Sequence, residues 1–352
     1  MHTTPPIFKD VVLPLTIFPV LSALAFHYIL RHMNQTGLDA KLTDGCNPLF
    51  DGHVTPYLIQ YTGIKGLDGH GLCPLVTFFH AAIATPDALS FLTYFVGVAA
   101  PLAIIPAVEG WREGRSLFIA FPVLFGILCQ TLTVGVTMPI YWMLFIITGG
   151  ASSTRATEAT KNPVVSQGHA EAIIFGVVVG AVIPSVAMLV LEDPHVTAIW
   201  QPYPVYVTIA QYAHLAIRPA SKHSKSGYPT IRALYIGAFI ICSSVHFSSI
   251  WPIVGDRNKL MTVFLPSLTS PDPSTDVGHK VLHFLKWDMF FGFASFTLAT
   301  LWFAGGAAHL LLLSIWIMFG TPLIGPGAVV MGAFLWRESC LQIQVVEKPK
   351  KA

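Results

Sequence analysis

Long apolar segments recur along the chain, and they constrain its fold more than any other feature. A helix needs about 20 apolar residues to cross the hydrocarbon core of a bilayer, and eight segments of the 352-residue sequence approach or exceed that length. Charged residues make up only 11% of the sequence, against roughly 25% in a typical soluble domain. We therefore predict an all-α integral membrane protein, a single polytopic bundle over residues 1–352 with about eight transmembrane helices (seven to nine). The eight segments are Val11–Leu30, Ala88–Val108, Leu117–Thr148, Ala170–Leu191, Ile199–Ile217, Thr230–Trp251, Phe284–Phe303 and His309–Trp336.

The third and the last of these segments contain residues that interrupt helices. Two glycines and Pro139 divide the segment 117–148, which is too long for one straight helix. It is either a kinked span or a span joined to a re-entrant piece, since breaks of this kind are tolerated where neighbouring helices satisfy the backbone. The last segment is broken around Pro322 and Pro326. These two segments make the number of spans the least certain part of the prediction.

A long loop, residues 31–87, follows the first predicted span. Its apolar part, Leu72–Ala84, is too short to cross a bilayer and predicts an interfacial or re-entrant helix. Cys46 and Cys73 flank the polar part of the loop; they form a disulfide if the loop faces an oxidising lumen and stay free thiols otherwise. Asn34 begins the triplet Asn-Gln-Thr and is a candidate glycosylation acceptor, which also favours a lumenal loop.

Positive charges give conflicting signals about orientation. Arg112 and Arg337 fall on the same side of an eight-span arrangement, and the positive-inside rule makes that side cytosolic. Arg218, Lys222 and Lys225 then fall on the opposite side, against the rule. The sequence alone therefore leaves the orientation open.

Several classes of function lack their signatures in this sequence. It contains no aspartate pair spaced to hold magnesium against a diphosphate, no set of histidine-rich boxes, and no P-loop, HExxH or GxSxG motif. We therefore expect no metal site and no cofactor. The net charge of +2 is too small for a nucleic-acid binder. No internal repeat is visible, which weighs against a small-molecule transporter or exporter, the alternative that we retain.

An acidic residue at membrane depth is a candidate for function, because burying its charge is expensive. Asp288 stands at the head of the seventh segment among aromatic residues, with Trp287, Phe290, Phe291 and Trp302 as candidate substrate-binding side chains. A carboxyl group buried among rings keeps its proton more readily and can act as a general acid. Aromatic faces nearby can stabilise a carbocation. The alternative is that Asp288 caps its helix or pairs with a neighbouring lysine.

Three further residues are candidates for the same site. Glu109 closes the second predicted span, and Arg112 lies one helical turn beyond it. The pair is either a second acid polarised by an arginine at a cavity mouth or a solvated ion pair in a short loop. His246 lies among serines in an apolar segment and is a candidate base for the final cation; the alternative is a hydrogen-bonded structural histidine.

Short motifs spread over residues 11–335 add a further signal. They are Tyr61-Thr62-Gly63-Ile64 with Leu67-Asp68, Leu72-Cys73-Pro74-Leu75-Val76-Thr77-Phe78-Phe79, Glu109-Gly110-Trp111-Arg112, Gln130, Pro139-Ile140-Tyr141, and Trp287-Asp288 followed by aromatic residues to Leu301-Trp302. In order and spacing the chain resembles the fungal membrane-bound terpene cyclase family typified by the enzyme of ascofuranone biosynthesis.

The resemblance implies an integral membrane cyclase of the endoplasmic reticulum. Such an enzyme acts on a farnesyl-type chain, often epoxidised and attached to a polyketide-derived ring, and works beside other enzymes of the same terpenoid or meroterpenoid pathway. The residues favour the same chemistry, because acids among aromatics without a metal–diphosphate motif suit cyclisation started by protonating an epoxide or an alkene. We therefore expect a hydrophobic prenylated substrate and contact with membrane lipid.

Overall fold

The computed structural model describes residues 7–47, 54–151 and 164–347, and regular structure in these ranges is helical apart from one isolated bridge between Ser166 and Ser226. In the list of helices, η marks short π-helical or 3₁₀ turns. The first half of the chain forms η1 (Phe8–Val12), α1 (Leu13–Phe26), η2 (His27–Arg31), α2 (His32–Gln35), α3 (Leu38–Asp44), η3 (Leu67–Leu72), α4 (Cys73–Ile83), α5 (Pro86–Val98), α6 (Ala100–Gly110), α7 (Leu117–Ala120), α8 (Pro122–Thr131) and α9 (Val134–Ile147). The second half forms α10 (Gln167–Val177), η4 (Val178–Val182), α11 (Ile183–Leu191), α12 (Pro194–Trp200), α13 (Tyr203–Ile217), α14 (Tyr228–Ile250), η5 (Trp251–Ile253), α15 (Arg257–Val263), α16 (Val277–Thr300), η6 (Leu301–Phe303), α17 (Ala307–Ile324) and α18 (Pro326–Glu347).

The all-α prediction is confirmed, and the count of about eight spans stays a prediction. Five described helical segments are long and apolar enough to cross a membrane. α16 is equally long but carries Lys280, Lys286 and Asp288, and it lies inside the bundle against α1, α4, α5, α9 and α18. The five candidate spans are Phe8–Gln35, Pro86–Gly110, Gln167–Leu191, Tyr228–Ile253 and Ala307–Ile324.

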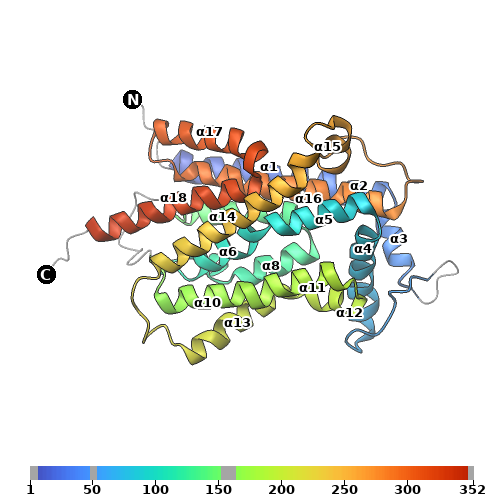
Figure 1. Ribbon diagram of the computed structural model, residues 1–352, viewed down its shortest axis with the longest axis horizontal. Helices are drawn as coiled ribbons and strands as arrows, with labels where there is room; N and C mark the ends of the chain where they lie inside the picture. Colours follow the sequence, from blue (N-terminus) through green and yellow to red (C-terminus); the bar gives the residue numbers. More distant parts are fainter. Residues whose placement is uncertain (1–6, 48–53, 152–163, 348–352) are drawn as a thin grey trace.

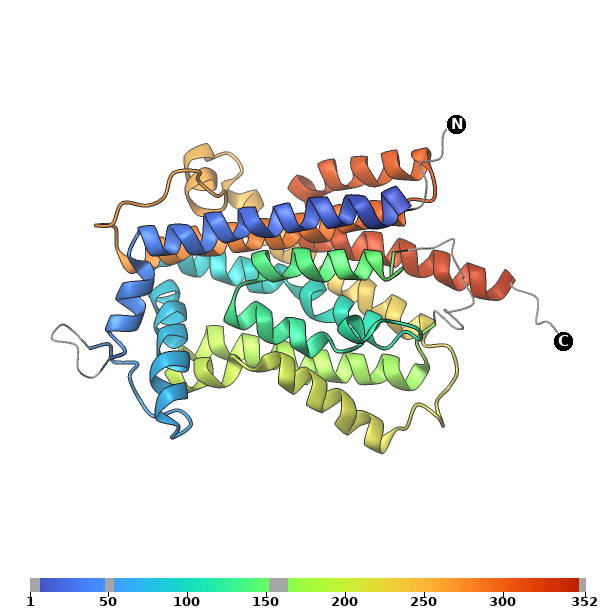
Figure 2. The same ribbon diagram turned by 180° about the vertical axis from the view of Figure 1, so that it is seen from behind.

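The third predicted segment begins with the short α7 and then forms a hairpin of α8 and α9 (Figure 2), so it is neither one kinked span nor a full span joined to a re-entrant piece. The backbone reverses at Leu132 and Thr133, and the Thr133 hydroxyl accepts a hydrogen bond from the backbone N–H of Val136 at 3.1 Å, which caps α9. Each helix is too short to cross a bilayer. The tip of this hairpin therefore ends inside the bundle.

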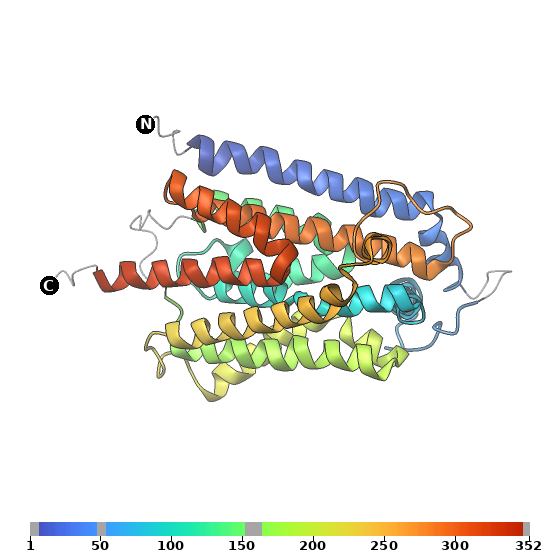
Figure 3. The same cartoon turned by 45° about the horizontal axis from the view of Figure 1, so that its top comes forward.

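The last predicted segment is also divided in two. α17 and α18 run back along each other (Figure 3), and Gly325 between them has φ of +90°, which only glycine adopts readily. Pro326 then begins α18 at the first helical position, where its missing N–H is not needed. The break expected around Pro322 and Pro326 is thus a reversal of the chain.

The two ends of the bundle differ, and we name them by their contents. At the disulfide end, α4 lies across the ends of the long helices, and α3 lies beside it after the end of the first long helix at α2 (Figure 1). Cys46 and Cys73 form a disulfide there, with their Cα atoms 5.9 Å apart. This is the paired alternative of the sequence analysis, and Leu72–Ala84 corresponds to α4. Disulfides persist in oxidising compartments, so this end fits a lumenal position.

The opposite end, which we call the arginine end, gathers the basic loops. Trp111, which precedes Arg112, borders one polar pocket together with Lys225 and Gln342 of α18. The two groups of positive charge that conflicted in the sequence therefore lie at the same end. The positive-inside rule predicts a cytosolic position for such an end, and the orientation stays a prediction.

Candidate active site

A cavity of about 280 Å³ lies inside the disulfide end, and we call it the main chamber. Helices α3 and α4, which the disulfide joins, form part of its wall together with α5, α16 and the tip of the α8–α9 hairpin. Six aromatic side chains line it: Phe78, Phe79, Phe95, Trp200, Tyr203 and Phe284. Its polar residues are Asp39, Thr43, Gln130, Thr131, Thr133 and Asp288. The other lining residues are Leu30, Met33, Leu42, Pro74, Leu75, Leu92, Val96, Ala99, Leu102, Cys129, Leu132, Val134 and Leu285.

Asp288 is buried in the wall of the main chamber, with 6% of its surface exposed. Its Oδ1 atom accepts a hydrogen bond of 2.6 Å from the backbone N–H of Gly135, in the first turn of α9. That turn has N–H groups without partners inside the helix, so a carboxyl oxygen is a natural partner for it. Asp288 thus holds the hairpin tip and faces an aromatic cavity. The expectation that Asp288 caps its own helix is wrong, because Asp288 lies in the middle of α16 and binds the first turn of α9 instead; its role as an acid stays a prediction.

The aromatic residues predicted around Asp288 lie on other faces of their helices. Trp287 and Phe291 stack with Tyr28 of η2, with the Tyr28 and Trp287 ring centroids 4.4 Å apart. Phe290 is half exposed, and Trp302 donates a hydrogen bond from Nε1 to the Lys9 carbonyl at 2.8 Å. None of these four predicted side chains borders the main chamber.

Helix geometry explains this difference for Trp287 and Phe290, whereas Phe291, three residues after Asp288, lies against Gly135 of α9. Residues three or four apart share a helix face, whereas neighbours one or two apart do not. Phe284 and Leu285 precede Asp288 by one turn and line the chamber with it, while Trp287 and Phe290 point away. The remaining rings come from α4, α5, α12 and α13, which the local sequence around Asp288 does not reveal. Phe78 and Phe79 were present in the motif at residues 72–79.

Asp39 is a second carboxyl group in the chamber wall, and the sequence analysis missed it. It lies on α3 between the buried Leu38 and Leu42, and this short apolar pattern in the polar loop was the available signal. Its Oδ2 atom accepts a hydrogen bond of 3.0 Å from the side chain of Asn34. The predicted glycosylation acceptor therefore lies beside this wall of the chamber.

Glu109 and Arg112 belong to a buried ion cluster at the arginine end. Glu109 is wholly buried, and its Oε1 atom lies 2.9 Å from Arg112 Nε and 2.7 Å from Arg337 Nη1. Arg115 also contacts Glu109, and Arg112 contacts Glu338. Neither Glu109 nor Arg112 lines the main chamber. The cluster joins α6 and the loop after it to α18, so its geometry is that of a structural contact that holds these helices together.

His246 connects three helices. Its Nδ1 atom is 2.9 Å from the Tyr94 hydroxyl on α5, and its Nε2 atom is 3.2 Å from the Pro322 carbonyl on α17. A carbonyl can only accept, so Nε2 carries the proton and Nδ1 accepts from Tyr94. Both ring nitrogens are engaged within the protein, and His246 is not among the residues that line the main chamber.

Comparison with known proteins identifies the family. The family model described as the CtvD domain matches residues 14–342 of this sequence. The chain belongs to the CtvD domain family. The fungal family resemblance inferred from the motifs is thereby confirmed.

Two relatives are informative. Terpene cyclase ascI of Acremonium egyptiacum is 29% identical over 300 residues, covering 80% of this chain and 74% of the relative. Terpene cyclase ctvD of Aspergillus terreus is 25% identical over 287 residues, covering 76% and 78%. No solved structure matches this CtvD-domain protein. The relatives' names support a terpene cyclase that handles a hydrophobic terpenoid substrate.

Proposed function

We propose that this protein is a membrane-bound terpene cyclase of meroterpenoid biosynthesis in which Asp288 starts cyclisation by protonating an epoxy-prenyl or prenyl chain. The observation that carries the proposal is a buried carboxyl group in the wall of a cavity of about 280 Å³ lined by six aromatic side chains. Such a cavity suits a folded hydrocarbon chain, and it lies within a bundle whose outer helices are apolar enough for a bilayer. Substrate then reaches the chamber from the lipid of the endoplasmic reticulum.

The proposed reaction is an isomerisation. The Asp288 carboxyl group gives its proton to the epoxide oxygen, and the bond from that oxygen to the tertiary carbon breaks with its electron pair staying on oxygen, which becomes a hydroxyl. The π electrons of the next alkene, or a hydroxyl oxygen of the substrate, attack the tertiary carbon and close the ring. The final cation loses a proton to the Asp288 carboxylate, which restores the acid. With a chain that carries no epoxide, the first proton adds instead to the less substituted carbon of the terminal double bond, which leaves the cation on the tertiary carbon.

The chamber supplies the other contributions to rate. Aromatic faces such as Phe284 and Trp200 attract a cation by about 0.5–2 kcal/mol each, more where water is excluded. General-acid help contributes about 10²–10⁴-fold. Folding the chain near its reactive conformation accounts for much of the rest. No metal is part of this scheme, and among the described residues no three His, Cys, Asp or Glu side chains come together as ligands.

Gln130 is the proposed partner of the substrate oxygen. Its side-chain Nε2 atom is buried and has no hydrogen-bond partner within the described protein, and the residue lines the same chamber as Asp288. A buried amide donor without a partner costs about 1–3 kcal/mol, which a substrate oxygen would recover. We assign Gln130 to binding the epoxide oxygen, which becomes the hydroxyl at the reacting end.

Replacing Asp288 by Asn tests the proposal. Asn keeps the oxygen that accepts from Gly135 and removes the titrating proton, so we expect turnover to fall at least about 10²-fold while the protein still accumulates in membranes. The assay is expression in a host that supplies prenyl precursors, followed by product analysis of microsomes. Asp44→Asn, on the exposed end of α3, is the control and should match wild type.

Other outcomes would redirect or end the proposal. Near-normal products from Asp288→Asn would remove Asp288 from the chemistry and make Asp39 the acid to test, by Asp39→Asn. If wild-type membranes form no cyclised product but accumulate or export a prenylated compound unchanged, the transporter alternative holds instead.

A further inference from the structure

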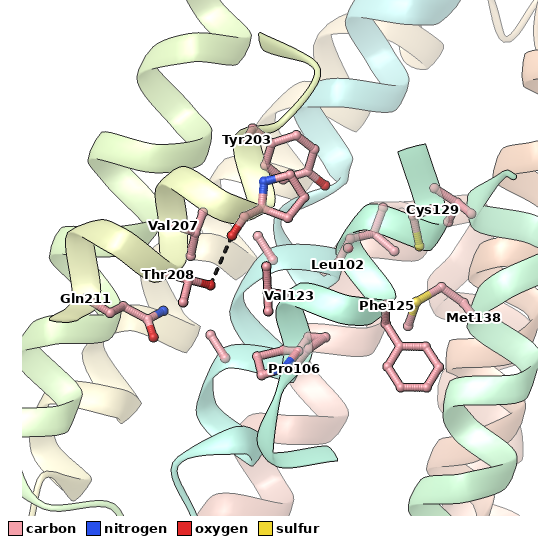
Figure 4. Close-up of a pocket in the computed structure, with 16 residues that line it drawn as sticks. Leu102, Pro106, Val123, Phe125, Cys129, Met138, Tyr203, Val207, Thr208 and Gln211 are labelled. Carbon is pink, nitrogen blue, oxygen red and sulfur yellow. Dashed lines mark hydrogen bonds between the residues drawn. The ribbon is translucent and has the colours of Figure 1, made fainter. Parts of the chain in front are cut away.

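A second, smaller cavity of about 50 Å³ adjoins the main chamber, and we call it the side chamber. Four residues line both cavities: Leu102, Cys129, Val134 and Tyr203. We call these four shared residues the neck. Figure 4 shows Tyr203, Leu102 and Cys129 along one edge of the side chamber, with Pro106 and Phe125 toward the opposite edge.

The wall of the side chamber is apolar and closely packed. It includes Ala103 of α6 and the buried Met138 of α9. α8 approaches α13 closely at Gly126, where a Cβ atom would lie 2.5 Å from the Cβ of Pro204. Gly126 is therefore required for this contact, which closes the chamber on that side.

Two polar side chains at the rim, those of Thr208 and Gln211, are already engaged. The Thr208 hydroxyl donates to the Pro204 carbonyl at 3.0 Å, as drawn in Figure 4. The Gln211 side-chain oxygen accepts from Trp111 Nε1 at 2.8 Å. An occupant of this space is therefore held by apolar contact and shape, which suits the hydrocarbon end of a molecule.

The volume fits a small branched group. At roughly 10–15 Å³ of such space for each water-sized particle, about 50 Å³ has room for about four heavy atoms. The two methyl groups at the end of a prenyl chain and the carbon that carries them make three, so the rest of the double bond or epoxide lies toward the neck.

Asp288 lies beside the neck. Val134 of the neck is followed directly by Gly135, whose N–H binds the Asp288 carboxyl group at 2.6 Å. A chain whose branched end fills the side chamber therefore has its terminal double bond or epoxide near the neck and near Asp288. The rest of the chain and its ring lie in the main chamber, toward Asp39.

We propose that the side chamber binds the branched apolar end of the substrate chain and thereby selects which position of the chain reaches Asp288. The inference rests on the proposed cyclase function and adds a register-setting subsite to it. Met138 and Ala103 are the residues that limit its size. Their role is positioning, since they contact the chain end and exchange no proton.

Enlarging the side chamber tests the proposal through product identity. In Met138→Ala the chain can slide deeper, so an internal double bond reaches Asp288. With a phenol bearing a farnesyl chain epoxidised at its terminal double bond as the probe, we expect products protonated at another position to rise at least about threefold as a share of the total. Met138→Leu conserves volume and should keep the wild-type ratio.

A second methionine supplies a matched control. Met188 is equally buried on α11 but lines neither chamber, so Met188→Ala carries a comparable loss of packing without a change of product ratio. An unchanged ratio in Met138→Ala, or an equal change in Met188→Ala, would overturn the proposal.

Filling the side chamber tests it in the opposite direction. Ala103→Leu adds three carbons to the wall, and a single methylene in such a pocket changes selectivity about 10- to 200-fold. We expect KM for the farnesyl probe to rise at least about 10-fold, while a probe lacking the two terminal methyl groups changes less than about threefold. Equal losses with both probes would reject the subsite.

These assays distinguish a failure of the cyclase function from a failure of the side-chamber subsite. Absence of any cyclised product from wild-type protein with every probe would reject the cyclase function. Active wild type with variants that leave product ratio and chain selectivity unchanged would reject the side-chamber subsite alone.

Discussion

Buried acidic side chains have different partners at the two ends of the bundle. At the arginine end, Glu109 is surrounded by guanidinium groups, three of which contact it directly. At the disulfide end, Asp288 is bound to a backbone N–H and borders an apolar cavity. A carboxylate among arginines has a fixed charge and holds helices together, whereas a carboxyl group beside an empty apolar space can exchange a proton with a ligand. Burial therefore does not by itself identify the catalytic acid; its partners do.

The largest expected difference between the two ends is in stability. Glu109→Gln would leave three buried arginines with a single carboxylate, that of Glu338, and removing one partner of a buried ion pair costs about 3–5 kcal/mol. We expect greatly reduced accumulation and a lower unfolding temperature, while the folded fraction keeps its turnover number. Thermal unfolding in detergent and product formation per folded protein measure the two quantities.

The exposed Glu113 provides the control for this experiment. Glu113→Gln should behave as wild type in both assays. Asp288→Asn is expected to lose activity and keep its stability, whereas Glu109→Gln is expected to lose stability and keep its turnover number. If Glu109→Gln abolished turnover in well-folded protein, the contrast between the ends would be mistaken.

Breaking the disulfide gives a smaller effect confined to the other end. Cys46 and Cys73 are 27 residues apart, and a link over such a loop contributes about 2–4 kcal/mol. Because α3 and α4 both line the main chamber, Cys73→Ser should lower the unfolding temperature and raise KM while kcat changes little. Reducing wild-type protein should reproduce the variant, and the free thiol variant Cys340→Ser should not. An unchanged KM in the reduced enzyme would show that the disulfide does not hold the wall of the main chamber in place.

The smallest effect is a pH dependence in the loop before α4. Burial opposes ionisation of Asp68, but hydrogen bonds from the Thr62 hydroxyl and from the backbone N–H groups of Thr62 and Gly63 outweigh it and hold the pKa of Asp68 below its ordinary value. Since the folded-state pKa is depressed, the carboxylate stabilises the fold above the unfolded pKa of about 3.9. That contribution is lost as the pH falls through the lower folded pKa.

Asp68→Asn sharpens this prediction. The gap in unfolding temperature between wild type and variant should be full near neutral pH and should shrink below about pH 4. Thermal unfolding measured across this range checks it. A gap that grows on acidification would give the opposite sign and contradict the assignment.

The sequence predicted best what depends on one continuous stretch of residues. A long apolar segment such as Pro86–Gly110 is recognisable by length alone. The α8–α9 hairpin was less predictable, because apolar composition does not reveal where the backbone reverses. Asp288 stood out through its apolar surroundings, whereas Asp39 lies in a polar loop that becomes a chamber wall only after folding.

Long-range partners account for most of the rest. Arg337 binds Glu109 across 228 residues, and nothing local to either residue indicates this contact. Helix periodicity does explain why Phe284 faces the chamber and Trp287 does not. Which way the Asp288 side chain points is set by its hydrogen bond to the N-terminus of α9, and this tertiary contact is not visible in the sequence.

The hydrogen bond between Asp288 and Gly135 has an evolutionary consequence. Position 288 must supply an oxygen that accepts from the hairpin tip, a demand that Asn also meets. A descendant that drifted from Asp to Asn would retain its fold and its apolar chambers while losing the transferable proton. Under the proposed role, such a pseudoenzyme would still hold a prenyl chain, so this fold stands one codon change away from a carrier of terpenoid intermediates.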